Sequence, residues 1–247
     1  MSGPPRDVPV RFVDIHTHMV PSGDDGVATI EEGLTLCREA ARRGTSVLYV
    51  TPHVNEELPL TTQRETSVRD GARELSSLLV ADGLEIRVGF ELNPAIDLTR
   101  DDARRYSLDG YSAVLIECPL EAGGTSDVTP IFAAAENVEA SGLLPILAHP
   151  ERCPALLADR GAASEAAGRG WLLQLTAASL MGRYGSIVAD FGWSLLEAEE
   201  AQIVASDGHR PNRPPYLDEA LSVLSERLGR PNALKLLDAS ALERAAT

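Results

Sequence analysis

Two histidines stand one residue apart near the start of the chain, where an apolar run from Val10 to Ile15 leads directly into His16 and His18. If this run is a strand, the alternation of side chains places both imidazoles on the same face. Two imidazoles on one face can hold a metal ion, and the nearby pair Asp24-Asp25 adds carboxylate oxygens. A short motif of this kind also arises by chance at the start of a core strand. Its interpretation therefore depends on the other histidines.

The chain has five histidines, and each one follows an apolar run with the character of a strand. Carboxylates occur at equivalent places, so the further candidate ligands are His53, Glu91, Glu117, His149, Asp207 and His209. In a barrel of alternating strands and helices, the carboxyl ends of the strands meet at one face, where active sites are built. Core packing alone gives no reason for all five histidines to lie there. The spacing predicts a metal-dependent active site at that face.

The types of ligand narrow the chemistry. Imidazoles and carboxylates without a thiolate suit manganese, iron, zinc or magnesium. Together with Asp25 they are too many for one ion, so we expect two or three divalent metals. Such clusters bind a hydroxide between metals and stabilise the attacking and leaving oxygens of a phosphoryl displacement. Arg152 follows His149 by three residues and Arg213 follows His209 by four; guanidinium groups match phosphate oxygens, although either arginine could instead form a surface salt bridge.

The segments that carry these residues alternate between strands and helices. Seven strands are expected at Val10–Ile15, Ser46–Thr51, Glu85–Phe90, Ser112–Ile116, Leu143–Ala148, Trp171–Leu175 and Gln202–Ala205. Helical spacing and terminal glycines predict helices at Thr29–Arg43, Thr61–Leu79, Asp127–Ser141, Ser186–Glu200, Pro214–Leu228 and Pro231–Arg244. The strands are mostly continuous apolar runs, which is typical of parallel strands buried on both faces. We expect a single α/β domain over residues 10–247, a barrel or barrel-like sheet, after a disordered tail at residues 1–9. Glu121–Asp127 is expected to be a flexible loop.

Composition excludes several classes of function. The 247 residues carry a formal net charge of −15, which disfavours nucleic acid as a partner. Cys37, Cys118 and Cys153 are odd in number and scattered, so we expect reduced, buried, structural thiols, as in a cytoplasmic protein. No apolar run is long enough for a membrane span, and the first residues lack the apolar core of a signal peptide. These features predict a cytoplasmic protein without an integral membrane segment.

Taken together, the motifs carry a family resemblance. They are Asp14-Ile15-His16-Thr17-His18, Asp24-Asp25-Gly26, Thr51-Pro52-His53, Glu91, Ala148-His149-Pro150-Glu151-Arg152, Gln174-Leu175-Thr176 and Ser206-Asp207-Gly208-His209. The series resembles the polymerase and histidinol phosphatase (PHP) superfamily. Within it, the chain is most similar to bacterial manganese-dependent tyrosine-protein phosphatases of capsule and exopolysaccharide clusters. The resemblance extends from about Asp14 to Asn232.

The resemblance implies a distorted (β/α)7–8 TIM-like barrel, the PHP fold, with three metal ions. It assigns one ion to His16, His18, Glu91 and Asp207. Glu91 would bridge to a second ion that Glu117 and His149 also bind, and the third ion would belong to Asp25, His53 and His209. Arg152 and Arg213 would bind the substrate phosphate and act, together with Asp207, as catalytic residues. The segment after His53, residues 54–60, lacks the basic residues or additional histidines often found there in the family, and the first nine residues lie outside the pattern.

The function implied is a metal-dependent phosphomonoesterase that hydrolyses protein phosphotyrosine through a metal-bridging hydroxide and regulates capsular or exopolysaccharide synthesis. Manganese is the expected metal, and a bacterial tyrosine autokinase of polysaccharide export is the expected partner. One alternative is a histidinol phosphatase or another small-molecule phosphoesterase with the same metals, and another is a non-catalytic metal-binding regulator. A metal-dependent amidohydrolase is a third alternative, but it would usually require a bridging lysine in mid-chain, and the only lysine is Lys235.

Overall fold

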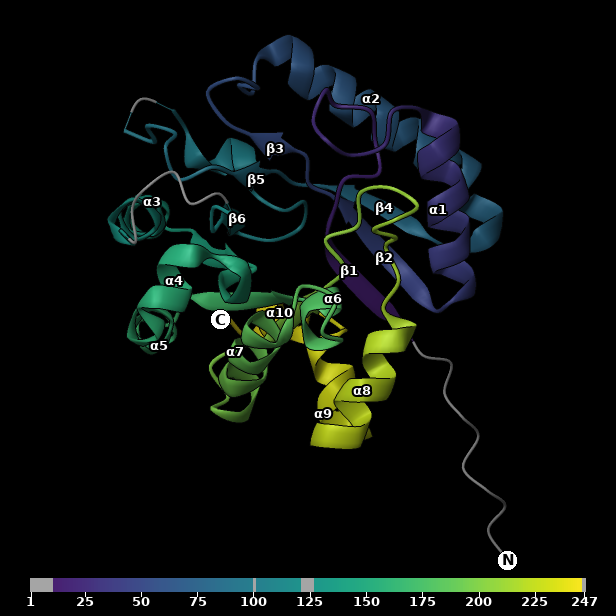
Figure 1. The fold of residues 1–247 in the computed structure, drawn as a ribbon. Coiled ribbons are helices and arrows are strands. Elements are labelled where there is room, and N and C mark those ends of the chain that lie inside the picture. The colour runs from purple at the N-terminus through teal and green to yellow at the C-terminus, as the bar shows by residue number, and fades with distance from the viewer. Residues whose placement is uncertain (1–10, 100, 121–126, 246–247) are drawn as a thin grey trace, which may run out of the picture.

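The computed structural model describes residues 11–99, 101–120 and 127–245. The tail expected at residues 1–9 and most of the loop expected at residues 121–127 lie outside the described residues. The described chain folds into an α/β structure in which parallel strands occupy the centre and helices surround them (Figure 1).

The strands form two sheets, and every strand pair within them is parallel. The first sheet has the order β1-β2-β4, with bounds Phe12–Thr17, Thr45–Val50 and Glu85–Val88. The second has the order β3-β5-β6-β7-β8-β9, with bounds His53–Val54, Glu91–Leu92, Ala113–Glu117, Leu144–Ala148, Leu172–Thr176 and Ile203–Ala205. All seven expected strands are present within two residues at each end. The two short strands β3 and β5 were not predicted, and each begins at a candidate metal ligand.

The expected barrel is only partly confirmed, because the strands form two sheets and not one closed sheet. The separation occurs where β2 gives way to β3 at Pro52, which has no N–H to donate to a ladder. Single backbone hydrogen bonds cross this junction, from Gly89 N to Val50 O over 3.0 Å and from Glu91 N to Pro52 O over 3.2 Å. At the other edge, His18 N donates to Gly208 O over 2.7 Å, which brings the chain after β9 beside β1.

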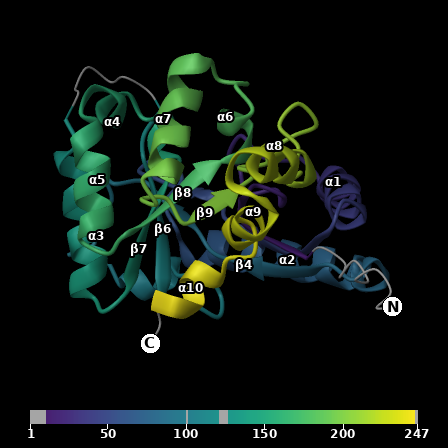
Figure 2. The same cartoon turned by 90° about the horizontal axis from the view of Figure 1, so that it is seen from below.

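Helices pack against the outer faces of the strands. In Figure 1, α1 (Ile30–Arg42) and α2 (Thr62–Leu78) lie on the side of β1, β2 and β4. Seen from below in Figure 2, α3 (Thr129–Ala140) and α5 (Arg160–Gly168) lie beside β7. The other helices are α4 (Pro154–Ala158), α6 (Ala177–Leu180), α7 (Ser186–Glu197), α8 (Asp218–Leu228), α9 (Arg230–Leu236) and α10 (Ser240–Ala245).

Two helix predictions were wrong in their extent, and three short helices were missed. Helix α8 begins at Asp218 and not at Pro214, where Pro215 disfavours a helical backbone at the residue before it. The expected helix Pro231–Arg244 is two helices, α9 and α10, separated near Ala239, whose φ is +55°. The segments that were not predicted are α4, α5 and α6.

The core consists of two clusters, one on each face of the strands. Along β6, Val114 and Ile116 belong to the larger cluster beneath the surrounding helices, whereas Ala113 and Leu115 belong to the smaller one. The smaller cluster also contains Leu242 of α10. Both faces of β6 are therefore buried, as the continuous apolar run predicted. The strands are held rigidly, and this fixes the positions of the side chains at their carboxyl ends.

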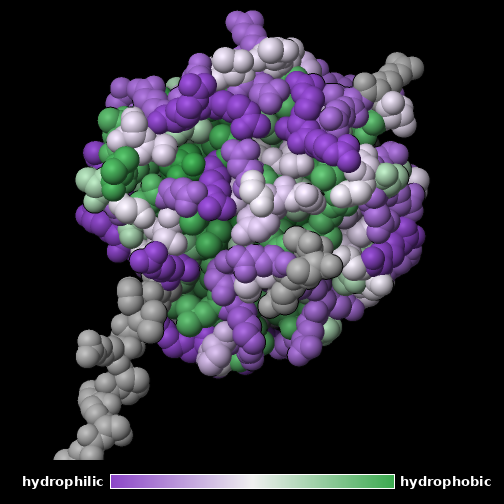
Figure 3. Space-filling view, turned by 180° about the vertical axis from the view of Figure 1, so that it is seen from behind, coloured by the Kyte–Doolittle hydropathy of each residue, from purple (hydrophilic) through white to green (hydrophobic). Residues whose placement is uncertain are grey.

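The outer surface is largely polar. Figure 3 shows the face opposite to that of Figure 1, where hydrophilic side chains predominate and hydrophobic ones lie between them. Among the described helices, none combines the length and the apolar character that crossing a membrane requires.

Candidate metal centre

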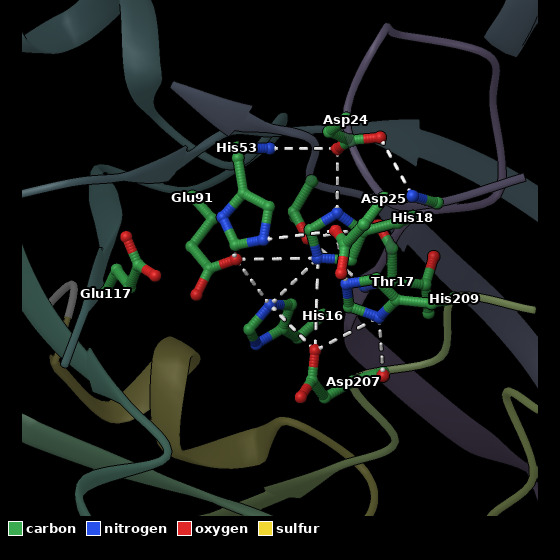
Figure 4. Close-up of polar contacts among 12 residues, drawn as sticks. His16, Thr17, His18, Asp24, Asp25, His53, Glu91, Glu117, Asp207 and His209 are labelled. Atoms are coloured by element: carbon green, nitrogen blue, oxygen red, sulfur yellow. Dashed lines mark hydrogen bonds and ion pairs between the residues drawn. The ribbon is translucent and has the colours of Figure 1, made fainter. Parts of the chain in front are cut away.

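All nine predicted ligands converge at the carboxyl ends of the strands. They lie at or after the ends of six strands, β1, β2, β4, β6, β7 and β9. Figure 4 shows eight of the nine around one space, with only His149 not labelled. Each belongs to at least one group of three or four residues whose ligand atoms lie within 4.8 Å of one another. The groups are His18, Asp25, His53 and His209; His16, His18 and Asp207; His16, Glu91 and His149; and His53, Glu91 and Glu117.

The centre of this arrangement is Glu91, which begins β5 and is fully buried. Its Oε1 lies 2.8 Å from His149 Nε2. Its Oε2 lies 3.0 Å from His53 Nδ1, 3.1 Å from His16 Nε2 and 3.4 Å from His18 Nε2, yet it accepts no hydrogen bond of acceptable geometry. A buried carboxylate oxygen without a donor is costly. Its surroundings of nitrogen atoms match those of an oxygen that shares cations with imidazoles.

Three imidazoles are oriented by an acceptor on the side away from this space. His16 Nδ1 lies 2.8 Å from Gln174 Oε1, and His18 Nδ1 lies 2.9 Å from Asp24 Oδ2. His209 Nδ1 lies 2.9 Å from a backbone oxygen, that of Asp207. When each ring is neutral, the acceptor holds its proton on Nδ1, and the lone pair is then on Nε2.

These lone pairs point at one another or at a carboxylate. The Nε2 atoms of His16 and His18 are 3.4 Å apart, and His209 Nε2 lies 3.1 Å from Asp25 Oδ1. Two electron pairs facing each other repel unless a proton or a metal cation lies between them. The donor set, nitrogen and carboxylate oxygen without sulfur, fits divalent cations such as manganese, iron, zinc or magnesium. The residues therefore fit a metal centre.

The geometry groups the ligands slightly differently from the assignment that the family resemblance implied. His18 lies with Asp25, His53 and His209 as well as with His16, and it stacks on His209 with ring centroids 3.8 Å apart. His53 lies beside Glu91 and Glu117 as well as beside Asp25. Neighbouring groups thus share His16, His18, His53 and Glu91, which is what a cluster of closely spaced ions requires.

Without metal, the carboxylates would keep protons on two of the imidazoles. Burial alone would lower the pKa of His16, but Glu91 and Asp207 raise it to about 9. Burial alone would also lower the pKa of His53, but the nearby carboxylate of Glu91 outweighs this effect and raises the pKa to about 10. Burial raises the pKa of Glu117, and the negative charge of Glu91 adds to that effect. Metal ions would have to displace these protons, which makes their binding dependent on pH.

Asp207 joins the candidate ligands to the two candidate phosphate-binding arginines. Its Oδ1 lies 3.5 Å from His16 Nε2, whereas its Oδ2 accepts hydrogen bonds from Arg152 and, over 2.7 Å, from Arg213. Asp207 and His149 both have positive φ, at 54° and 41°, values that non-glycine residues rarely adopt. Backbone strain of this kind is concentrated at functional sites. Both arginines pair with the buried Asp207, and Arg213 also lies 3.8 Å from the exposed carboxylate of Asp25, so their ion pairs are with candidate metal ligands.

Asp24, which was expected to add a carboxylate oxygen for the metal, and several other residues around the site make contacts that were not predicted from the sequence. Asp24 accepts a hydrogen bond from His18 and Gln174 from His16, so both orient ligands. Asn93 donates to Glu117 Oε2 over 2.7 Å. Arg64 donates to the backbone oxygen of His53 over 2.8 Å and also to Ser22 O and Leu58 O. Gln174 could have been recognised as a polar residue in the middle of an apolar strand, but nothing local identifies Asn93 or Arg64.

The three cysteines are free and buried, as expected. Cys37 and Arg43 have the six-residue spacing of a phosphate loop of cysteine phosphatases, but Cys37 lies within α1 and Arg43 caps its end. Burial raises the pKa of the Cys37 thiol to about 12. A helix does not form the loop that cradles phosphate, and a protonated thiol is a poor nucleophile. The spacing alone would allow cysteine-based phosphatase chemistry, but the helical structure of this segment excludes it.

Comparison with known proteins gives a consistent family match. The family model described as capsular polysaccharide synthesis, CpsB/CapC, matches residues 12–243. The tyrosine-protein phosphatase YwqE of Bacillus subtilis is 31% identical over 234 residues, covering 88% of this chain and 85% of that protein. The tyrosine-protein phosphatase CpsB of Streptococcus pneumoniae is 26% identical over 238 residues, covering 91% and 94%.

Solved structures agree. Crystal structures described as YwqE from Bacillus subtilis and CpsB from Streptococcus pneumoniae, unique metal-dependent tyrosine phosphatases, include a match with a TM-score of 0.81, 27% identity and 95% coverage of both chains. The phosphotriesterase homology protein of Escherichia coli is only 10% identical, with a TM-score of 0.58, covering 95% of this chain and 98% of that one. That second likeness concerns the fold alone.

Proposed function

This chain belongs to the CpsB/CapC family of capsular polysaccharide synthesis proteins, and we propose that its metal centre hydrolyses phosphotyrosine in proteins. The observation that carries the proposal is the arrangement around Asp207, where one carboxylate faces the imidazoles of the metal centre and also two arginines. Because a single carboxylate contacts both sets of residues, the metal ions and the two arginines would lie close enough to bind the same phosphate group. The tyrosine phosphatase activity named for YwqE and CpsB supports this substrate.

We assign the metal ions to the nine converging side chains, with manganese as the native metal: His16, His18, Asp25, His53, Glu91, Glu117, His149, Asp207 and His209. When bound, divalent cations acidify water for attack on phosphorus and offset the charge of the phosphate oxygens. The chain prepares for this by engaging Nδ1 of His16 and His18 with Gln174 and Asp24, which turns Nε2 of each ring toward the metal ions.

Arg152 and Arg213 bind the phosphate oxygens in this proposal. The side chain of Arg152 is only 10% exposed and that of Arg213 is 27% exposed, so each is partly shielded from water. A guanidinium in such a place neutralises negative charge that develops in the transition state better than one in bulk water. Asp207 positions both guanidinium groups, because its carboxylate pairs with Arg152 and with Arg213. The leaving group, a phenolate with a pKa near 10, needs less protonation than an alkoxide.

The wider setting follows from the family. We propose a bacterial tyrosine autokinase of polysaccharide export as the protein substrate and a cytoplasmic location, which three free cysteines support. We further propose that residues 10–247 form one PHP-type domain and that its two sheets are parts of one distorted barrel. The small core cluster supports this, because it joins Ile15 of β1 and Tyr49 of β2 to residues of β6, β7, β8 and β9.

Other functions are less well supported. Histidinol phosphate would use the same metals, but the relatives matched over most of the chain are named tyrosine phosphatases. A non-catalytic regulator would be expected to have lost a ligand or an arginine, and all eleven candidate residues are present and converge.

The test measures phosphate release by metal-stripped protein with and without added Mn²⁺, on a phosphotyrosine peptide and on histidinol phosphate in parallel. We expect Mn²⁺-dependent hydrolysis of the peptide well above that of histidinol phosphate. Glu91→Gln should abolish it, whereas Glu85→Gln, an exposed glutamate at the far end of β4, should not. Equal or greater activity on histidinol phosphate would overturn the substrate, and no release by metal-loaded protein would overturn the reaction.

A further inference from the structure

A second, smaller cavity adjoins the metal centre. Its volume is about 180 Å³, and it lies between α6, the turn that follows α6, and the segment that precedes α8. The larger cavity, of about 480 Å³, is lined by six of the nine candidate ligands, namely Asp25, His53, Glu117, His149, Asp207 and His209. Arg213 lines both cavities. A phosphate paired with Arg213 therefore lies at the boundary between the two.

The walls of the two cavities differ in chemistry. The larger one is acidic, with Asp24, Asp25, Glu57 and Glu117 among its lining residues. The smaller one is lined by uncharged and aromatic groups next to Arg213, namely Ala178, Met181, Tyr184, Pro214 and Tyr216.

The charged groups of the smaller cavity are balanced. Arg183 and Glu219 both line it, and they pair with each other over 2.6 Å. Glu219 thus brings no unpaired negative charge to repel a phosphate ester. What remains available to a ligand is an amphipathic space with Arg213 at one end and aromatic rings at its sides.

The two tyrosine rings are held by arginines. The ring of Tyr184 lies 4.1 Å from the guanidinium carbon of Arg152, one of the proposed phosphate-binding residues. The ring of Tyr216 lies 4.3 Å from that of Arg43. Stacking of this kind restrains aromatic side chains. Tyr184 also connects the wall of the small cavity directly to the phosphate site.

We propose that the smaller cavity is an aryl subsite that receives the phenyl ring of the phosphotyrosine substrate. The proposal rests on the proposed function and adds to it the place where the ring binds. The size is suitable, because a cavity of about 150 Å³ is known to hold benzene. The chemistry is suitable too, since aromatic rings favour contact with other rings and with apolar groups. Phosphoserine and small alkyl phosphates would leave this space unfilled.

The experiment measures ring binding separately from turnover, because aryl phosphates also have better leaving groups. Isothermal titration calorimetry of Mn²⁺-loaded full-length protein would compare phenylphosphonate with methylphosphonate, two ligands that cannot be hydrolysed. We expect phenylphosphonate to bind roughly three- to tenfold more tightly, the range that one aromatic contact contributes. Ala178→Phe would fill the cavity and should bring the ratio of the two affinities close to one.

Two further variants distinguish a change in the cavity from a general loss of folding. Tyr216→Ala removes one wall without adding bulk, and it should lower the ratio even if Ala178→Phe fails to fold. Ala133→Phe makes the same substitution at an exposed position of α3 that lines a different surface cavity, so it should keep the wild-type ratio. Thermal unfolding of each variant identifies any general loss of structure.

The outcomes distinguish this proposal from the proposed function. Equal affinity of the two phosphonates for wild-type protein, or no binding of either, would overturn the aryl subsite. An unchanged ratio in folded Ala178→Phe and Tyr216→Ala would also overturn it. If the phosphotyrosine peptide is hydrolysed in these cases, the proposed function stands. A preference for phenylphosphonate that the variants remove, without peptide hydrolysis, would instead keep the subsite and overturn the function.

Discussion

Asp24 offers a sharp test of the metal centre, because we place it beside the ligands and not among them. Its carboxylate is 2% exposed and accepts three hydrogen bonds. Oδ2 accepts from His18 Nδ1 over 2.9 Å and from His53 N over 3.2 Å, and Oδ1 accepts from Gly26 N over 3.1 Å. Although burial opposes it, the hydrogen bond to His18 holds the pKa of Asp24 well below its usual range. Asp24 is thus ionised and fixes the orientation of one ligand and the backbone of another.

The substitution Asp24→Asn keeps the shape and removes the charge. An amide has one oxygen, so its NH₂ group must face either the donor of Gly26 or the donors of His18 and His53. At least one hydrogen bond is lost, and a donor then faces a donor. Removing an acceptor of this kind typically reduces metal affinity or activity by about 10- to 100-fold, which corresponds to about 1.4–2.7 kcal/mol.

The assay is a titration of metal-stripped protein with Mn²⁺ that yields affinity and stoichiometry, followed by the turnover of the loaded enzyme. Asp102→Asn is a matched control, because Asp102 accepts a backbone hydrogen bond from Arg104 but is 58% exposed and remote from the site. Wild-type affinity and turnover in Asp24→Asn would refute the reasoning. Loss of one whole equivalent of metal would show instead that Asp24 is itself a ligand.

Three further predictions concern pH, phosphate binding and stability. Because metal-free His16 and His53 have pKa values raised to about 9 and 10, Mn²⁺ affinity should rise with pH from about 6.5 to 10, as measured by titration at several pH values. The stability that these protonated rings give the metal-free protein should be complete below pH 6.5 and lost across the same interval. Lysine at Arg152 or Arg213 should lower kcat/KM by about 10- to 100-fold, since the bidentate geometry is lost. Gly208→Ala should lower stability by about 1–3 kcal/mol in thermal unfolding, because its Cβ would lie 2.7 Å from Pro215.

Each of these has a control and a result that would contradict it. Arg38→Lys, in an exposed ion pair with Asp82 that lines neither cavity, should keep kcat/KM, and equal losses at Arg38 and Arg152 would remove the special role of the latter. Gly168→Ala should be tolerated, because nothing lies within 4 Å of its new Cβ, and a comparable loss there would contradict the steric argument. Metal affinity independent of pH would show that His16 and His53 carry no proton to displace.

The sequence alone identified the candidate ligands that the structure brings together. Seven of the strands were predicted from apolar runs in the sequence, and all five histidines follow such runs. The carboxyl ends of parallel strands lie at one edge, so the convergence of His16, His53 and His149 could be predicted without any long-range information. The buried cysteines and the main helices were also predictable, because helical periodicity and glycine stops are local properties.

Only the tertiary structure decided how these residues work together. Gln174 is 158 residues from His16, and their hydrogen bond decides which nitrogen of His16 carries the proton. Arg152 and Asp207 meet across 55 residues. The strands divide into two sheets at single residues such as Pro52, which has no N–H for a ladder. The small cavity depends on how α6 packs beside α8. Local periodicity carries no information about such contacts, because they depend on which distant segments the packed core brings together.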